Sequence, residues 1–355
     1  MVKYVSSFCH SQDNCGGFGD RIRGSISAFF IALCTGRALR ISWRRGANLN
    51  DYFNINEQMY NVSKQEFERS ITVQNENDIQ RVIFIDSGME GNLLKWSAQT
   101  NFSDHLKDYV SIRTNSMAAI EGTLRNPDFT QFYSSMLIGG SSDQNQVFDM
   151  SVFVSAALKI ILSQPNDLLR QTFNKCVVQV VGEETWRNSF RIGVQIRMLN
   201  QNWNEYGIRV TEAKIPCFSE AVNFIMKLEN IQNSTNTLVF FTSDSDGAYT
   251  TFKDALAQCC PAVKVVDTNA ICSDVLHSGH LERSSNQNTW MSRAKTFVDW
   301  LALTEMHRLI ISRSGFAEMA SFYSLQPTLR FAHWIQNQTC PFQPFNIVGP
   351  TIAME

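Results

Sequence analysis

Three segments of the sequence place polar side chains directly after an apolar run that has the length of a strand. Arg197 follows IGVQI, Asp244 and Ser245 follow TLVFFTS, and Arg313 and Ser314 follow LIIS. In an open α/β sheet, the carboxyl ends of the strands form the edge at which ligands bind. A guanidinium at that edge is suited to an anion, and so is a Ser-Gly turn that opens a helix, because the first N–H groups of a helix have no partner within it.

Two further segments carry groups that could take part in binding or proton transfer. Asp299 lies within an apolar helical pattern, FVDWLAL, where a carboxylate is costly unless it is paired. It either faces solvent or accepts hydrogen bonds from a ligand such as the guanine edge. Near the amino terminus, GGFGDR places Gly19, Asp20 and Arg21 between a strand and a helix, but without the G-x-G-x-x-G spacing of a dinucleotide site. Asp20 either caps the helix or serves as a base or orienting group.

The elements that must position these residues alternate along the chain. Short apolar runs are followed by helical patterns of about 10 to 15 residues, which predicts βαβ units and parallel sheets. The pattern is blurred between about 100 and 150, and no order is predicted there. It breaks near 165 to 190, so we expect two Rossmann-like domains, residues 1–165 and 166–355, facing each other across a cleft.

Composition excludes several classes of protein. The chain of 355 residues is 44% hydrophobic with a net charge of −2, and it has no basic run of the kind that binds nucleic acid. No apolar stretch reaches the length of about 18 residues that spans a bilayer. No signal peptide follows Met1, so we expect either a cytoplasmic protein or a portion trimmed from a membrane-anchored enzyme of the Golgi or secretory lumen.

The nine cysteines and four N-x-S/T sequons leave the compartment open. Cys9 and Cys15 flank a short loop and are either bridged or free. Cys34 falls in an apolar helical pattern, which favours a place in the core.

Four blocks of the sequence, taken together and in order, resemble the superfamily of fucosyltransferases that use GDP-fucose. The blocks are GGFGDR, IGVQIR, FFTSDSD and DWLALTEMHRLIISRSGF. The superfamily includes core α1,6-fucosyltransferases, protein O-fucosyltransferases and plant cell-wall fucosyltransferases. The interval of 15 residues from Asp299 to Ser314 is typical, and Gln195 before Arg197 is most similar to the plant type. The resemblance implies a GT-B fold with an acceptor-side domain (1–165) and a nucleotide-sugar donor domain (166–355).

The resemblance also implies roles for individual residues. Arg197 matches the arginine that binds the β-phosphate of the donor, and Asp299 matches an aspartate that reads guanine. Asp20 falls where protein O-fucosyltransferases carry an asparagine near the reacting centre, so Asp20 and Arg197 are the expected catalytic residues. The full set expected at the donor is Gly19, Arg21, Gln195, Arg197, Asp244, Ser245, Asp299, Arg313, Ser314, Gly315 and Phe316.

The chain departs from the family pattern at three positions. Many relatives have His in place of Gln195, a second Arg in place of Met198 and an acidic residue in place of Asn200. Since Met198 cannot bind phosphate, Arg197 must act alone or with a neighbouring arginine; the candidates are Arg21, Arg23 and Arg313. The general base stays open between Asp20 and the polar-loop residues Glu282, His277 and His280.

The implied reaction is an inverting transfer of L-fucose from GDP-β-L-fucose to a hydroxyl of an oligosaccharide or glycoprotein acceptor. No metal or other cofactor is expected, because the D-S-D at 244–246 only superficially matches the D-x-D motif of metal-dependent transferases. The acceptor is expected on the first domain and the loops at 44–60, 96–115 and 268–291, with Trp43, Trp96 and Trp203 as candidate stacking residues. Two alternatives are a transferase for another nucleotide sugar and a catalytically silent carbohydrate-binding protein.

Overall fold

The computed structural model describes residues 4–9, 17–43, 49–55, 79–84, 90–101, 109–129, 149–198, 210–231, 236–267, 290–332 and 339–345. These residues fall into two compact units. One holds the described residues up to Gln164, and the other holds those from Pro165 onward. Among the described residues, no helix is long and apolar enough to cross a bilayer.

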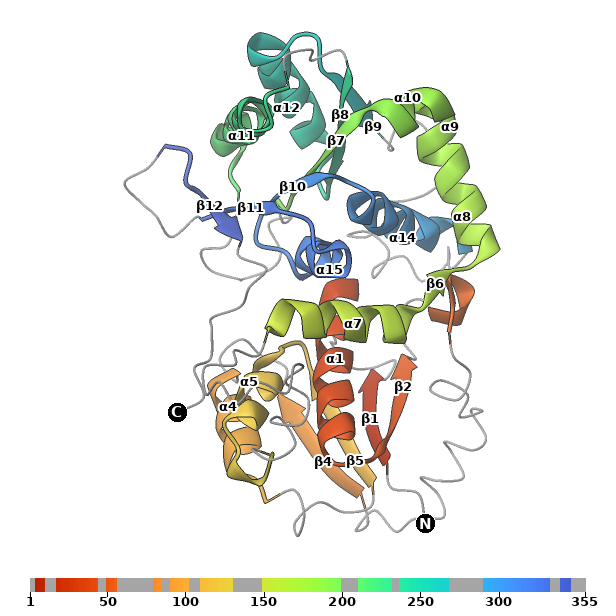
Figure 1. Ribbon diagram of the computed structural model, residues 1–355, viewed down its shortest axis with the longest axis vertical. Coiled ribbons are helices and arrows are strands. Elements are labelled where there is room, and N and C mark those ends of the chain that lie inside the picture. The colour runs from red at the N-terminus through yellow and green to blue at the C-terminus, as the bar shows by residue number, and fades with distance from the viewer. Residues whose placement is uncertain are drawn as a thin grey trace, which may run out of the picture. The chain divides into compact units, whose positions relative to one another are not determined.

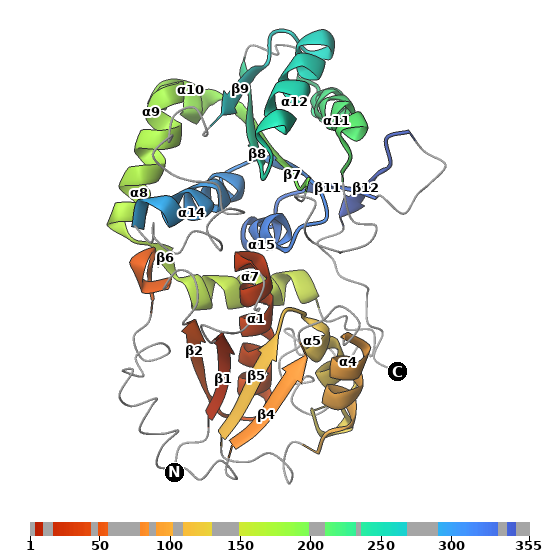
Figure 2. The same ribbon diagram turned by 180° about the vertical axis from the view of Figure 1, so that it is seen from behind.

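The first unit is built on a four-stranded parallel sheet in the order β2-β1-β5-β4. Its strands are β1 (Tyr4–Cys9), β2 (Ala38–Trp43), β4 (Ile79–Phe84) and β5 (Tyr109–Thr114). Helix α1 runs along one face of this sheet with α7 beside it, and Figure 2 shows the sheet in front of α1. The other elements up to Gln164 are α1 (Phe18–Cys34), η1 (Leu49–Asp51), β3 (Phe53–Asn54), α4 (Glu90–Gln99), α5 (Ala118–Leu124), η4 (Pro127–Phe129) and α7 (Met150–Leu162). The short strand β6 (Gln164–Pro165) pairs with β3.

Helix α1 forms because its apolar residues recur at helical spacing on the face that meets the sheet. Ile22, Ile26 and Phe30 are each fully buried. Gly24 lies on the same helix where α1 approaches β5 closely. A Cβ at Gly24 would lie 2.0 Å from the carbonyl oxygen of Thr114, so any larger residue would push the helix off the strand.

The second unit carries a six-stranded sheet in the order β12-β11-β10-β7-β8-β9 (Figure 1). Five strands are parallel and β12 pairs antiparallel to β11 at the edge. The strands are β7 (Phe190–Ile196), β8 (Thr237–Ser243), β9 (Lys264–Asp267), β10 (Arg308–Ile311), β11 (Thr328–Phe331) and β12 (Phe342–Phe345). The helices are α8 (Asp167–Phe173), the π-helix η5 (Asn174–Val178), α9 (Gln179–Val181), α10 (Glu183–Asn188), η6 (Glu212–Lys214), α11 (Ile215–Leu228), α12 (Asp246–Cys259), α14 (Trp290–Thr304) and α15 (Gly315–Ser324).

Helices cover both faces of this sheet, as expected for buried parallel strands. On one face, Ile192, Val194 and Ile196 of β7 pack in a single core cluster with α11 and α12. On the other face, Gly193 of β7 leaves room for α14. A Cβ there would come within 2.7 Å of side-chain atoms of Leu309 and of Met306, which follows α14. The glycine within the strand therefore allows close packing of helix on sheet.

The fold class predicted from the sequence, α/β with two Rossmann-like units and parallel sheets, is confirmed. Helix α15 covers the residues that the pattern GFAEMASFYS predicts. In the blurred region, by contrast, β5 and α5 were not predicted. Strand β5, with the sequence YVSIRT, interrupts its apolar residues with polar ones, and its Ser111 is buried because the hydroxyl pairs with that of Ser6 at 3.1 Å.

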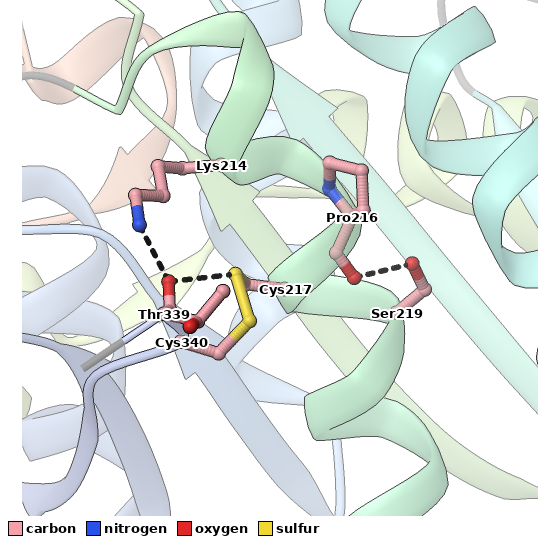
Figure 3. The surroundings of a disulfide bond; sticks show 6 residues. All are labelled: Lys214, Pro216, Cys217, Ser219, Thr339 and Cys340. Atoms are coloured by element: carbon pink, nitrogen blue, oxygen red, sulfur yellow. Dashed lines mark hydrogen bonds between the residues drawn. A yellow bond between two sulfur atoms is a disulfide. The ribbon is translucent and has the colours of Figure 1, made fainter.

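In the second unit, a disulfide links the segment before the edge strand β12 to helix α11. Cys217 in the first turn of α11 is bonded to Cys340 beside β12, with Cα atoms 5.1 Å apart (Figure 3). The Nζ of Lys214 donates a hydrogen bond to the carbonyl of Thr339 at 2.6 Å, next to the bridge. Cys176 is also disulfide-bonded, whereas Cys259 and Cys260 are free thiols.

Replacing Cys217 and Cys340 together by Ser is expected to lower the free energy of unfolding by about 2–5 kcal/mol, because the bridge closes a long loop in the unfolded chain. The sequence separation of its two cysteines is 123 residues. Chemical denaturation of both proteins, with and without a reductant, measures the difference. Cys259→Ser, which removes an exposed free thiol, is the matched control and should leave stability unchanged. Equal stability of the double variant and the wild type would rule out a stabilising bridge.

His307 makes the stability of the second unit depend on pH. Its Nδ1 accepts a hydrogen bond from the backbone N–H of Arg191 at 2.9 Å, and its ring stacks on Phe190. Burial lowers the pKa of His307 below its ordinary value of 6.5, and the nearby charges of Arg191 and Arg308 lower it further. As the pH falls, His307 is therefore protonated at a higher pH in the unfolded chain than in the folded chain. This contribution to stability is complete above about pH 6.5 and is lost as the pH falls through the folded pKa.

We expect the thermal midpoint of the wild type to fall more steeply than that of His307→Asn between about pH 7.5 and pH 5.5. Asparagine keeps an acceptor near the position of Nδ1 but does not titrate. Scanning calorimetry across this range measures both proteins. Parallel curves would show that His307 carries no pH-dependent stability.

Candidate functional site

The buried hydroxyl of Ser312 makes two hydrogen bonds at the end of β7. Its Oγ accepts a hydrogen bond from the backbone N–H of Arg197 at 2.8 Å and donates one to Oε1 of Gln195 at 3.0 Å. The backbone N–H of Ser312 also donates to the carbonyl of Gln195 at 2.9 Å. Because Ser312 directly follows β10, these bonds tie the carboxyl ends of two neighbouring strands together. Gln195 is buried as well, and in this arrangement it supports the strand end.

Asp244, which directly follows the neighbouring strand β8, holds Arg197. Its Oδ1 accepts the backbone N–H of Met198 at 2.7 Å, and its Oδ2 lies 3.3 Å from Nε of Arg197. One carboxylate therefore orients both the guanidinium and the peptide that follows it. The Arg197 side chain remains 38% exposed, so it is open to a ligand. Met198 directs its side chain to the apolar core cluster, in keeping with a residue that does not bind phosphate.

Helix α15 begins at the same edge of the sheet, three residues beyond Ser312. Ser314 occupies the N-cap position with extended backbone, and its side chain makes no capping hydrogen bond. Gly315 and Phe316 form the first turn, whose N–H groups and positive dipole end favour an anion. Arg313, between the two serines, is exposed. The site thus combines a held guanidinium with a helix N-terminus.

A second helix, α12, also begins at this edge. Ser245 is its N-cap residue, yet its side chain makes no capping hydrogen bond either. Its backbone N–H donates to the hydroxyl of Ser243 at 3.2 Å. Asp244, one residue earlier, accepts the backbone N–H of Met198 and pairs with Arg197.

Asp299 is buried on α14 and paired. Its Oδ2 accepts a hydrogen bond from Nζ of Lys295 at 2.6 Å and another from Oγ1 of Thr242 at 2.9 Å. Thr242 lies one residue before the end of β8, which places Asp299 beside the strand end that carries Asp244. Sequence reasoning missed Lys295, although its spacing of four residues from Asp299 on a helix was a usable signal.

The remaining predicted residues lie in the first unit or outside the described residues. Gly19 is buried, and the guanidinium of Arg21 lies 6.0 Å from the ring centroid of Trp43. Asp20 accepts a hydrogen bond from the backbone N–H of Gly17 at 3.1 Å, which is the reach of an acidic residue in the first turn of a helix. The residues outside the described part of the chain are Asn200, Trp203, His277, His280 and Glu282.

No cluster of three His, Cys, Asp or Glu side chains that could hold a metal ion occurs among the residues whose placement is described.

Comparison of the sequence with models of known protein families and with curated proteins gives no match. Among solved structures, a mutant of Arabidopsis thaliana FUT1 in complex with GDP is 12% identical and has a TM-score of 0.60. This alignment covers 99% of the present chain and 72% of the FUT1 chain. NodZ α-1,6-fucosyltransferase soaked with GDP-fucose is 15% identical, with a TM-score of 0.50 over 97% of the present chain and 99% of NodZ. The chain therefore has the GT-B fold of these fucosyltransferases, as its sequence blocks implied.

Proposed function

We propose that the protein is a fucosyltransferase that moves L-fucose from GDP-β-L-fucose to a hydroxyl of a glycan acceptor with inversion at the anomeric carbon. One observation carries the proposal. Arg197 is held by Asp244 and Ser312 at the same sheet edge at which α15 begins. The fold similarity supports the donor class, because one similar structure was solved with GDP and another was soaked with GDP-fucose.

In this proposal the diphosphate lies between the guanidinium and the helix. Arg197 binds the β-phosphate, while the hydroxyl of Ser314 and the N–H groups of Gly315 and Phe316 hold phosphate oxygens. Asp244 orients Arg197 and, with Ser245, borders the nucleoside. Asp299 accepts hydrogen bonds from guanine. The C-terminal unit is thus the proposed donor domain and the N-terminal unit the proposed acceptor domain.

The proposed reaction needs stabilisation of the leaving group more than covalent chemistry. The acceptor oxygen attacks C1 of fucose, the bond from C1 to the β-phosphate oxygen breaks, and a general base takes the acceptor proton. Negative charge grows on the departing GDP, where Arg197 and the first turn of α15 act as preorganised positive groups. These groups compensate the charge without a metal. Asp20 is the proposed base, and its hydrogen bond with Gly17 would orient it.

A transfer assay on an array of oligosaccharides and glycoproteins tests the proposal. GDP-fucose is compared with GDP-mannose and UDP-galactose, each with magnesium or with EDTA. We expect transfer from GDP-fucose alone, at the same rate with EDTA, and an α-linked product by NMR. Transfer from UDP-galactose alone would show that the donor sugar is not fucose. A β-linked fucoside would contradict inversion at the anomeric carbon.

A further inference from the structure

Two free thiols follow one another at the end of helix α12. Cys259 is the last residue of the helix and is exposed, whereas Cys260 comes directly after it and is 6% exposed. The Sγ of Cys259 donates hydrogen bonds to the carbonyls of Ser219 and Leu256 at 3.7 Å and 3.6 Å. Cys260 belongs to the core cluster that β7 forms with α11 and α12. One thiol of the pair is thus open to small reagents, and the other is shielded from them.

The two thiols also interact with each other. Burial, the largest cause, and the thiol of Cys259, through a hydrogen bond and through its charge, raise the pKa of the Cys260 thiol to about 12. The charge of Lys227 on α11 acts in the opposite direction. Since the thiolate is the nucleophile, Cys260 is weakly reactive at neutral pH. A reaction of the pair therefore starts at Cys259.

A bond between these two sulfurs differs from the bridge elsewhere in the same unit. Consecutive Cα atoms lie about 3.8 Å apart, below the usual range of about 4.4–6.8 Å across a disulfide. The Cα atoms of Cys217 and Cys340, 5.1 Å apart, fall within that range. Strained or exposed disulfides are the ones that are easily reduced. We propose that Cys259 and Cys260 form a reversible redox site that is oxidised by small disulfides of the glutathione type.

The proposed oxidation consists of two thiol–disulfide exchanges. The thiolate of Cys259 attacks one sulfur of glutathione disulfide, so that a mixed disulfide forms at Cys259 and one glutathione leaves. The thiolate of Cys260 then attacks the Sγ of Cys259 and displaces the second glutathione. The two cysteines lose two protons and two electrons, and glutathione disulfide is reduced to two molecules of glutathione.

One tryptic peptide isolates the pair. Cleavage after Lys253 and Lys264 releases residues 254–264, whose only cysteines are Cys259 and Cys260. The folded protein is incubated with glutathione disulfide, its free thiols are blocked with N-ethylmaleimide, and the peptide is weighed by mass spectrometry without reduction. We expect a glutathione adduct first and then a peptide that has lost two hydrogen masses. The second step should become about tenfold faster per pH unit between about pH 7 and pH 9, because the thiolate fraction of Cys260 rises in that proportion.

Two variants separate the roles of the thiols. Cys260→Ala should keep the adduct at Cys259, because no second thiol displaces glutathione, and Cys259→Ser should not react. An adduct that persists in the wild type as long as in Cys260→Ala would show that the pair does not close and would overturn the proposal. Equal reaction of Cys259→Ser and the wild type would show that Cys259 is not the point of entry.

Titration of the oxidised protein with dithiothreitol tests reversibility. The adjacent pair should be reduced at a concentration that leaves the bridge between Cys217 and Cys340 intact. The same peptide, weighed after the thiols are blocked, reports its reduction. A closed pair that resists dithiothreitol as well as this bridge does would contradict a reversible site.

Discussion

Arg197→Ala is expected to lower kcat for transfer from GDP-fucose by about 10² to 10³, the typical cost of removing one preorganised donor to a developing negative charge. Asp244 and Ser312 hold the arginine at the strand end before the ligand arrives. Its stabilising effect is therefore available without reorganisation when the bond to GDP breaks. The variant keeps the hydrogen bond from Met198 to Asp244, so the strand end should stay in place.

Steady-state kinetics with GDP-fucose and a reactive acceptor measure this effect, with circular dichroism to confirm folding. Arg187→Ala, which removes an exposed arginine from α10, is the matched control and should keep wild-type kcat. An increase in KM alone, with kcat unchanged, would show that Arg197 binds substrate and transition state equally. No change in either constant would show that Arg197 does not act at the site.

Ser314→Asp is expected to weaken the binding of GDP without lowering the stability of the fold. Aspartate is a favourable N-cap residue and its charge complements the helix dipole, so the thermal midpoint should stay unchanged or rise. The same charge would face the diphosphate. Repulsion of a few kcal/mol at close range in a partly exposed site would weaken GDP binding by about 10² or more.

Calorimetric titration with GDP and a thermal melt of the same sample measure both quantities. Asn166→Asp is the matched control, because it adds a carboxylate at another N-cap of the same unit, that of α8. It should leave GDP binding unchanged. GDP binding at the wild-type level by Ser314→Asp would show that α15 does not hold the phosphates.

Much of the second unit could be predicted because its signals are local. Strands β7, β8 and β10 are rich in apolar residues, and α15 has its start marked by Ser314 and Gly315. Polar residues that follow such strands fall at one sheet edge by the geometry of parallel pairing. The positions of Arg197, Asp244 and Ser314 at that edge follow from these two facts.

Contacts between distant residues could not be predicted in the same way. The contacts of Ser312 with Gln195 and of Asp244 with Arg197 join residues at the ends of different strands, and they depend on strand order and register. Strand β5 could not be predicted because its buried Ser111 interrupts the apolar run. The hydrogen bond between Ser111 and Ser6 on the neighbouring strand explains why a buried serine is tolerated there. The pair of Lys295 and Asp299 differs, since a spacing of four residues on a helix was visible in the sequence.

We propose that the carboxyl edge of the second sheet binds a guanine nucleotide diphosphate. Calorimetric titration of the wild-type chain with GDP, ADP and UDP tests it most directly, with Arg197→Ala as the paired sample. We expect saturable binding of GDP, at least about tenfold tighter than that of ADP or UDP, and its loss in the variant. Absence of GDP binding, or equal binding of all three nucleotides, would contradict the claim.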